Sequence, residues 1–202
     1  MNLNTFRRIK FEFMIKATYQ DKYKVVDILA ASFDDNQSVN YIVKQDKKRT
    51  QRIRKLMAYS FDICYLYGEV FLADDKSACA LILLPDKKKS NVKSILLDIK
   101  LIVSCIGISN IKKAMKRERK IKKSYPKELM YYLWFIGVEP DKQNMGIGSA
   151  LIKKVIEEAH SKQRPVYLET STLKNIPWYE KFGFKIYNEL NLGYPLFFMK
   201  KE

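Results

Sequence analysis

The sequence is poor in residues that build covalent or metal-bound frameworks. Its 202 residues include only three cysteines, Cys64, Cys79 and Cys105, an odd number without paired spacing. This set excludes a disulfide scaffold or a zinc finger and indicates reduced core thiols of a cytosolic protein. The single histidine, His160, is expected at the protein surface and not in catalysis, and we expect no bound metal.

A hydrophobic run long enough to cross a membrane is also absent. The most apolar window, residues 95–108, is interrupted by Asp98 and Lys100, and it is shorter than the roughly 20 apolar residues of a spanning helix. The N-terminal stretch MNLNTFRRIKFEF has no long apolar run before a small-residue cleavage site, so no signal peptide is expected. We therefore expect a cytoplasmic protein without a membrane span.

Acidic residues are few relative to basic ones. The chain has 38 Lys and Arg against 22 Asp and Glu, a net charge of +16. Such a balance is compatible with binding to nucleic acid or to an anionic membrane surface. No RNA- or DNA-binding motif accompanies the charge, so we favour lysines that solvate helices, and we expect no nucleic-acid partner. A basic surface would also attract a polyphosphate cofactor.

The chain has no internal repeat, low-complexity tract or interdomain linker, so we expect one domain over residues 1–202. A hydrophobic content of 47% with 13% aromatic residues is typical of a globular protein. After a loose start over residues 1–10, the pattern predicts strands at 11–18, 69–73, 78–84, 131–138, 166–170, 184–189 and 196–200. It predicts helices at 18–33, 92–106, 111–123, 146–161 and 175–182, the first opened by a capping box of Thr18 and Asp21. It also predicts a helical region that is broken near residues 45–48 and ended by Gly68, with an apolar stripe at Ile53, Leu56, Met57, Ser60 and Cys64. The 92–106 helix has one broad apolar face. This order indicates one α/β domain.

The most informative stretch joins the strand at 131–138 to the helix at 146–161. It reads VEPDKQNMGIGSALI, with Gly146 and Gly148 bracketing one residue at the helix start. Glycine has no Cβ, so the bare backbone can approach a ligand. The free N–H groups of a first helical turn, together with the helix dipole, favour an anion. The stretch therefore predicts a phosphate-binding loop.

Spacing separates three kinds of phosphate loop. A P-loop requires Gly-Lys followed by Ser or Thr, but Gly148 is followed by Ser149. A dinucleotide fingerprint requires a tight turn and a third glycine, but the turn is long and Leu151 occupies that position, although Glu169 mimics its acidic residue. The remaining pattern is V-x-P-x-x-Q-x-x-G-x-G-x-x-L.

That pattern resembles motif A of the GCN5-related N-acetyltransferases (GNAT), and the positions that carry the resemblance are Val138, Pro140, Gln143, Gly146, Gly148 and Leu151. The downstream run YLETSTLKNIPWYEKFGF resembles a later motif of the same superfamily, and its LETS, N-x-P, YE and GF succession is similar to the puromycin N-acetyltransferase-like group. The resemblance implies the GNAT acyl-CoA N-acyltransferase fold. That fold has a mixed, mostly antiparallel twisted sheet with helices on both faces, and here a helical insertion at about residues 90–125 separates the third and fourth strands.

The resemblance also implies acetyl-coenzyme A (acetyl-CoA) as cofactor. Main-chain N–H groups of the loop would hold the pyrophosphate, and these belong to Gln143, Asn144, Met145, Gly146, Ile147, Gly148 and Ser149. The strand that ends at Val138 is expected to splay from the strand at 166–170, and the pantetheine arm would pair with the backbone of Ile136, Gly137 and Val138. Asn175 corresponds to a residue that contacts coenzyme A, and it also fits a helix N-cap.

Tyr179 matches the tyrosine that many members of the superfamily use as general acid. Its phenol has a reference pKa of about 10, so it is protonated at neutral pH. The alternative is a tyrosine ring that packs in the core. Glu169 is the first candidate for a general base, because it lies on the strand beside the cofactor gap. Asp34 and Asp35 are further candidates, and a water relay or a neutral amine would remove the need for a base.

The resemblance implies direct transfer, in a ternary complex, of an acetyl group to a primary amine of a small molecule, such as an antibiotic or aminonucleoside-like acceptor. A protein or peptide amine is the alternative acceptor. A different class of function is a nucleic-acid or membrane-surface binding module that uses the basic run at residues 112–123. A homodimer is compatible with either function.

Overall fold

The computed structural model describes residues 14–202. These residues form a seven-stranded sheet of order β1-β2-β3-β4-β5-β7-β6. The strands are β1 (Met14–Lys16), β2 (Gly68–Ala73), β3 (Ala78–Leu83), β4 (Tyr131–Val138), β5 (Val166–Thr170), β6 (Lys185–Asn191) and β7 (Pro195–Lys201). Neighbouring strands are antiparallel except for β4 and β5, which are parallel. The predicted mostly antiparallel mixed sheet is confirmed. The loose start predicted over residues 1–10, and the beginning of the strand predicted at 11–18, lie outside the described residues.

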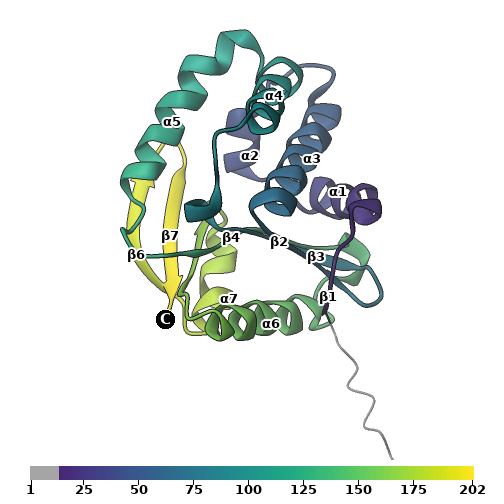
Figure 1. The fold of residues 1–202 in the computed structure, drawn as a ribbon, viewed down its shortest axis with the longest axis vertical. Helices are drawn as coiled ribbons and strands as arrows, with labels where there is room; N and C mark the ends of the chain where they lie inside the picture. The colour runs from purple at the N-terminus through teal and green to yellow at the C-terminus, as the bar shows by residue number, and fades with distance from the viewer. Residues whose placement is uncertain (1–13) are drawn as a thin grey trace, which may run out of the picture.

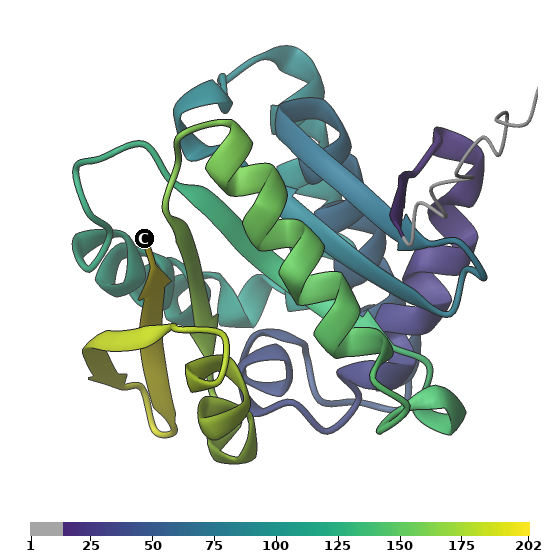
Figure 2. The same ribbon diagram turned by 90° about the horizontal axis from the view of Figure 1, so that it is seen from below.

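Helices cover both faces of the sheet (Figure 1). One face carries α1 (Lys22–Ser32), α2 (Gln37–Ile42), α3 (Arg49–Tyr67), α4 (Val92–Leu101) and α5 (Ile111–Lys123). The opposite face carries α6 (Ile147–Ser161) and α7 (Ile176–Glu180), and Figure 2 shows α6 lying across the strands. The insertion between β3 and β4 contains α4 and α5, as predicted.

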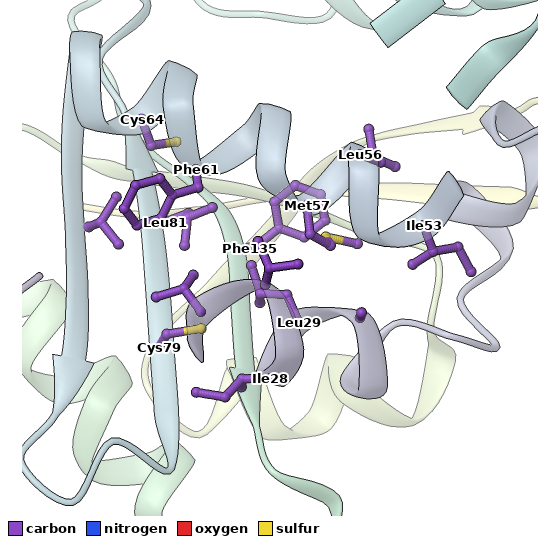
Figure 3. Packing of buried hydrophobic residues seen from close by; sticks show 14 of the residues in the cluster. Ile28, Leu29, Ile53, Leu56, Met57, Phe61, Cys64, Cys79, Leu81 and Phe135 are labelled. Carbon is purple, nitrogen blue, oxygen red and sulfur yellow. The ribbon is translucent and has the colours of Figure 1, made fainter. Parts of the chain in front are cut away.

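Two hydrophobic clusters fix these layers to the sheet. In the first, Met57 and Phe61 of α3 point toward Leu29 of α1 and Leu81 of β3 (Figure 3). The stripe predicted on this helix is buried in full, at Ile53, Leu56, Met57, Ser60 and Cys64. The second cluster joins α6 and α7 to the other face of β3, β4 and β5. The three cysteines are free and buried, which fits their predicted place in the core.

A bulge in β4 opens the centre of the sheet. Against β3, Phe135 pairs with Leu81 and Leu133 pairs with Ile82, so the register passes over Trp134. A bulge of this kind bends its strand and increases the local twist. Beyond it, β4 leaves β5, because the two strands pair only from Tyr131↔Val166 to Leu133↔Leu168. The last five residues of β4 therefore have an open edge toward β5.

The helix predicted at 92–106 is divided in the structure, because α4 ends at Leu101 and a π-helical segment, Ile102–Ile106, follows it. The apolar stripe of α4, made of Val92, Ile95, Leu96 and Ile99, is 50–75% exposed and does not pack on the sheet, and Val103 in the following segment is 64% exposed. The opposite side of the helix faces α3 through polar contacts. Tyr59 Oη donates a hydrogen bond to Asp98 Oδ1 over 2.6 Å, and Asn91 Nδ2 donates to Tyr67 Oη over 2.8 Å. These contacts turn the apolar stripe outward.

Within the described part of the chain, no single helix is both long and apolar enough to cross a bilayer. The segments Val92–Ile106 and Ile108–Lys123 meet that test of length and composition only when taken together, and they are bent by 103°.

Candidate active site

A single large cavity occupies the opening between β4 and β5. Its volume is about 1750 Å³, more than the roughly 300–1,000 Å³ typical of a pocket for one drug-sized ligand. It is lined by the loop after β4, the start of α6, the ends of β4 and β5, α7, and the helices of the insertion. Two reactants can therefore meet inside it.

The glycine loop forms one end of this cavity. Asn144 and Gly146 have φ angles of +63° and +82°, in the left-handed region that suits glycine and asparagine. Gly146 is the N-cap of α6, so the helix begins at Ile147 with its first N–H groups directed out of the helix. A Cβ at Gly148 would lie 3.4 Å from Val138 Cγ2 and 3.6 Å from Trp178 Cζ2. The loop thus presents bare backbone and a helix N-terminus, which suit a phosphate.

Side-chain hydrogen bonds hold the loop in place. Gln143 Nε2 donates to the carbonyl of Val138 over 3.2 Å, and Ser32 Oγ donates to the same carbonyl over 2.9 Å. At the other end of the loop, Trp178 Nε1 donates to Ser149 Oγ over 3.3 Å. Gln143 therefore has a role in shaping the loop, in addition to its predicted contact with the cofactor.

The predicted cofactor residues differ in where their side chains lie. Nine of them line the cavity, namely Ile136, Gly137, Val138, Gln143, Asn144, Gly146, Gly148, Ser149 and Asn175. The side chain of Met145 is 70% exposed, and that of Ile147 packs against the second core cluster. Met145 and Ile147 can therefore contribute through their main chains, as the sequence predicted.

Tyr179 reaches the cavity from α7. Its ring is 6% exposed and packs edge-on against Trp178 and Phe184. Burial raises the pKa of the Tyr179 phenol further above its usual value, and no charge or hydrogen bond from the described residues contributes to that shift. Tyr179 is thus protonated at neutral pH and lines the same cavity as the glycine loop. Asn175 occupies the N-cap position of this helix, as its place in the sequence suggested, but its side chain makes no capping hydrogen bond to the described residues.

Glu169 also lines this cavity, from the end of β5. Burial raises the pKa of its carboxyl group to about 7, although the Arg117 guanidinium and the phenols of Tyr132 and Tyr125 act in the opposite direction. Its Oε1 atom is buried and has no hydrogen-bond partner among the described residues. A carboxyl group with a pKa near neutrality is suited to exchange a proton with a ligand.

The other candidate acids and bases have different surroundings. Asp34 forms an ion pair with Arg49 at 3.0 Å, whereas Asp35 lines the cavity. His160 is exposed near the end of α6. Within residues 14–202, no three His, Cys, Asp or Glu side chains gather in a way that could hold a metal ion.

Sequence reasoning missed the residues around Glu169. Arg117 of α5 is 9% exposed; its Nε donates to Tyr194 Oη over 2.9 Å and its Nη2 to Ser38 Oγ over 2.6 Å. It lies in a strongly basic helix, so its charge alone does not distinguish it from solvated neighbours. The one available signal was its spacing from Ile121, which is also buried, since residues four apart share a helix face.

Comparison with known proteins agrees with this geometry. Residues 99–186 match the family description Acetyltransferase (GNAT) domain. An uncharacterized N-acetyltransferase from Schizosaccharomyces pombe is 39% identical over 54 residues, which are 27% of this chain and 22% of that protein. A probable serine/threonine-protein kinase from Dictyostelium discoideum is 34% identical over 79 residues, 39% of this chain and 8% of that protein. The chain thus spans less than a quarter of either curated relative.

Solved structures extend the likeness to most of the chain. A structure described as histone acetyltransferase HPA2 and related acetyltransferase, from Corynebacterium glutamicum, superposes with a TM-score of 0.72 and 22% identity. The superposition covers 93% of this chain and 94% of that one. The seven-stranded sheet with its surrounding helices is therefore the GNAT acetyltransferase fold.

Proposed function

We propose that this protein, which has the GNAT fold, is an acetyl-CoA-dependent N-acetyltransferase that transfers the acetyl group directly to a primary amine of a small molecule. One observation carries the proposal. A single cavity is lined by a helix-starting glycine loop, an open strand edge, a protonated tyrosine and a carboxyl group with a pKa of about 7. Fold alone would not assign an activity, because one fold supports many functions.

The residues at the loop end of the cavity fit acetyl-CoA. The positive φ of Gly146 and the small size of Gly148 leave the N–H groups of Ile147, Gly148 and Ser149 accessible to a pyrophosphate. The open edge of β4 offers backbone groups of Ile136 and the N–H of Val138 to amides of the pantetheine arm, while the Val138 carbonyl is held by Ser32 and Gln143. A backbone N–H at this edge can also polarise the thioester carbonyl.

The two proton transfers of the reaction are assigned to Glu169 and Tyr179. As the amine nitrogen bonds to the acetyl carbon, Glu169 accepts the proton that the amine must lose, and its pKa of about 7 leaves a large ionised fraction at neutral pH. As the carbon–sulfur bond breaks, Tyr179 donates its phenolic proton to the departing thiolate. An amine that arrives neutral, or a water relay, could replace the step assigned to Glu169.

We further propose membership in the puromycin N-acetyltransferase-like group, with an antibiotic or aminonucleoside-like acceptor. The LETS and N-x-P succession at residues 168–177 supports this, as does the helical insertion between β3 and β4. A single domain over residues 1–202 and a cytoplasmic location belong to the same proposal. The alternative acceptor, a protein or peptide amine, is distinguished by experiment.

The experiment follows release of the coenzyme A thiol with a chromogenic thiol reagent, using small amines and lysine-containing peptides as acceptors. We expect thiol release that requires an amine and adds one acetyl group to it by mass spectrometry. Activity on peptides alone would contradict the small-molecule acceptor. If acetyl-CoA binds but no amine, large or small, stimulates thiol release, the proposed activity is wrong.

A second candidate function is binding to an anionic membrane surface. The exposed apolar stripe of α4 lies in the same insertion as the basic helix α5, and this combination favours it. Flotation with phosphatidylserine vesicles measures such binding. Salt-sensitive flotation that is lost when Lys112, Lys113 and Lys116 become glutamine would support it, and equal recovery with neutral vesicles would contradict it.

A further inference from the structure

We infer that the acceptor is a primary amine with an apolar body, either an aromatic ring or an alkyl chain, and that this body binds beneath the insertion, between α4 and α5. The inference rests on the proposed function and specifies its acceptor. It starts from the end of the cavity opposite the glycine loop.

Apolar side chains form a large part of the walls at that end. Its lining includes Leu101, Ile102, Ile111, Met115, Tyr132 and Trp134. Trp134 is the residue at the β4 bulge, so the distortion that opens the sheet also places an indole ring in the cavity wall. Apolar surface removed from water stabilises a complex by about 25 cal/mol per Å². Walls of this kind favour a ligand with a matching apolar body.

Two polar side chains at that end, Asp98 and Arg117, are already engaged, whereas one buried atom is not. Asp98 accepts a hydrogen bond from Tyr59, and Arg117 donates to Tyr194 and Ser38. That atom is Glu169 Oε1, which is buried without a partner among the described residues. A buried carboxylate oxygen in this state is stabilised by a donor with positive charge, such as the ammonium group of an acceptor before it loses its proton.

The arrangement disfavours acceptors with several charges. A second ammonium group on the acceptor would lie against the apolar walls, where an unpaired charge is costly. Arg119 also lines the cavity and would repel it, whereas Lys122 forms an ion pair with Glu118 at 3.6 Å. Polyamines and lysine-rich peptides therefore fit this cavity poorly.

Two neighbouring residues on the exposed stripe of α4 differ in whether they line the cavity. Ile95 is 50% exposed and lines the cavity, whereas its neighbour Leu96 is 61% exposed and is not among the lining residues. Met115 of α5, 58% exposed, also lines the cavity. Exposed apolar side chains from both helices of the insertion thus belong to the cavity, where an apolar body can cover them.

The first experiment compares kcat/KM at saturating acetyl-CoA for octylamine, 2-phenylethylamine, ethanolamine, putrescine and a lysine-containing peptide. We expect octylamine and 2-phenylethylamine to exceed ethanolamine and putrescine by at least about tenfold, because each extra buried methylene contributes about 0.8 kcal/mol. Equal values, or a preference for putrescine or the peptide, would overturn the inference. Such a result would leave the transferase activity itself intact, whereas no activity on any amine would contradict the proposed function.

The second experiment uses the matched pair of residues. Ile95→Asn should raise KM for octylamine by about fivefold, because the apolar surface that Ile95 presents to the acceptor is lost. The affinity for acetyl-CoA should be unchanged. Leu96→Asn should retain the wild-type KM. Both positions are exposed, so both variants are expected to fold. Equal KM changes in the two variants, or no change in either, would place the apolar body elsewhere and overturn the inference.

Discussion

Glu169 is the residue at which stability and function conflict. A buried carboxyl oxygen without a hydrogen-bond partner destabilises a folded protein, and the Oε1 atom of Glu169 is one such atom in the cavity wall. The guanidinium of Arg117 offsets part of this cost, yet the pKa remains raised to about 7. Such a conflict is expected where a residue serves a ligand and not the fold.

We predict that Glu169→Gln stabilises the protein at alkaline pH. The folded-state pKa of about 7 lies above the ordinary 4.5, so between these values the folded state binds the extra proton. Folding free energy is therefore lost as pH rises from about 4.5 to 7. The glutamine variant avoids this loss, so at pH 8 we expect it to be more stable by roughly 1–3 kcal/mol. Thermal denaturation should show the gain at pH 8 and little of it at pH 4.5.

The same substitution, Glu169→Gln, should lower activity although it raises stability. Wild-type kcat/KM should rise with pH through about 7 as Glu169 ionises, and Glu169→Gln should lose that limb of the profile. Glu118→Gln is the comparison variant, because Glu118 also lines the cavity, with its side chain 53% exposed. Its charge contributes to the raised pKa of Glu169, so this variant should keep the rising limb and move it to lower pH. A wild-type pH profile in Glu169→Gln would rule out Glu169 as the base.

We predict that Tyr179→Phe lowers kcat on the order of 100-fold, the lower range of a general-acid contribution. Its acetyl-CoA affinity should stay within about twofold of wild type, because the ring packing with Trp178 and Phe184 is retained. Steady-state kinetics and calorimetry measure the two quantities. Unchanged kcat, in a variant for which chemistry limits turnover, would assign Tyr179 to the core alone.

At the scale of helices and strands, the sequence predicted correctly those segments that have a strong local pattern of apolar residues and glycines. The strand at 131–138 and the helix that follows it have the predicted bounds to within one residue. An apolar run followed by a two-glycine turn is a local signal. The bulge at Trp134 was not predicted, because register depends on how β3 and β4 pair and not on either sequence alone.

The α4 helix shows the complementary limit. Its periodicity correctly indicated one apolar face, but periodicity does not state what that face contacts. Hydrogen bonds from Tyr59 and Asn91 decide its rotation, and they connect residues 24 and 39 positions apart in the sequence. Polar pairs that are distant in sequence leave no periodic signal.

The contact between α1 and β4 gives a prediction at this scale. A Cβ at Gly137 would lie 3.0 Å from both Leu29 Cδ2 and Ser32 Oγ. Gly137→Ala should therefore destabilise the protein by about 1–3 kcal/mol, the usual cost of overpacking. Gly148→Ala is the control, because its Cβ makes contacts of 3.4 Å and longer. Urea denaturation of both variants measures the difference, and equal midpoints would show that α1 moves to accommodate the methyl group.

At the scale of the whole molecule, the sequence motifs predicted one end of the cavity better than the other. The loop, Tyr179 and Glu169 were identified from short motifs, and the structure brings all three to one cavity. Three further residues were not identified, because Arg117 reaches the cavity from the insertion, Trp134 lies at the bulge, and Tyr132 belongs to no motif. The acceptor end therefore required the tertiary structure.

The net charge of +16 belongs to this scale as well. Many lysines lie on exposed helix faces, as on α5, where Lys112, Lys113, Lys116 and Lys120 are exposed. A positive surface around an open cavity raises the local concentration of an anionic cofactor, so acetyl-CoA association should slow as salt increases.

The central claim is that the glycine loop binds acetyl-CoA, and calorimetry on wild type, Gly148→Ala and Gly148→Asp tests it most directly. The site has room for a Cβ at position 148, so both variants should fold. Wild type should bind acetyl-CoA. Gly148→Asp should show no measurable binding, because a carboxylate at the helix start repels the pyrophosphate and crowds it, while Gly148→Ala should show an intermediate loss. Equal affinity of all three proteins, or no binding by wild type, would contradict the account.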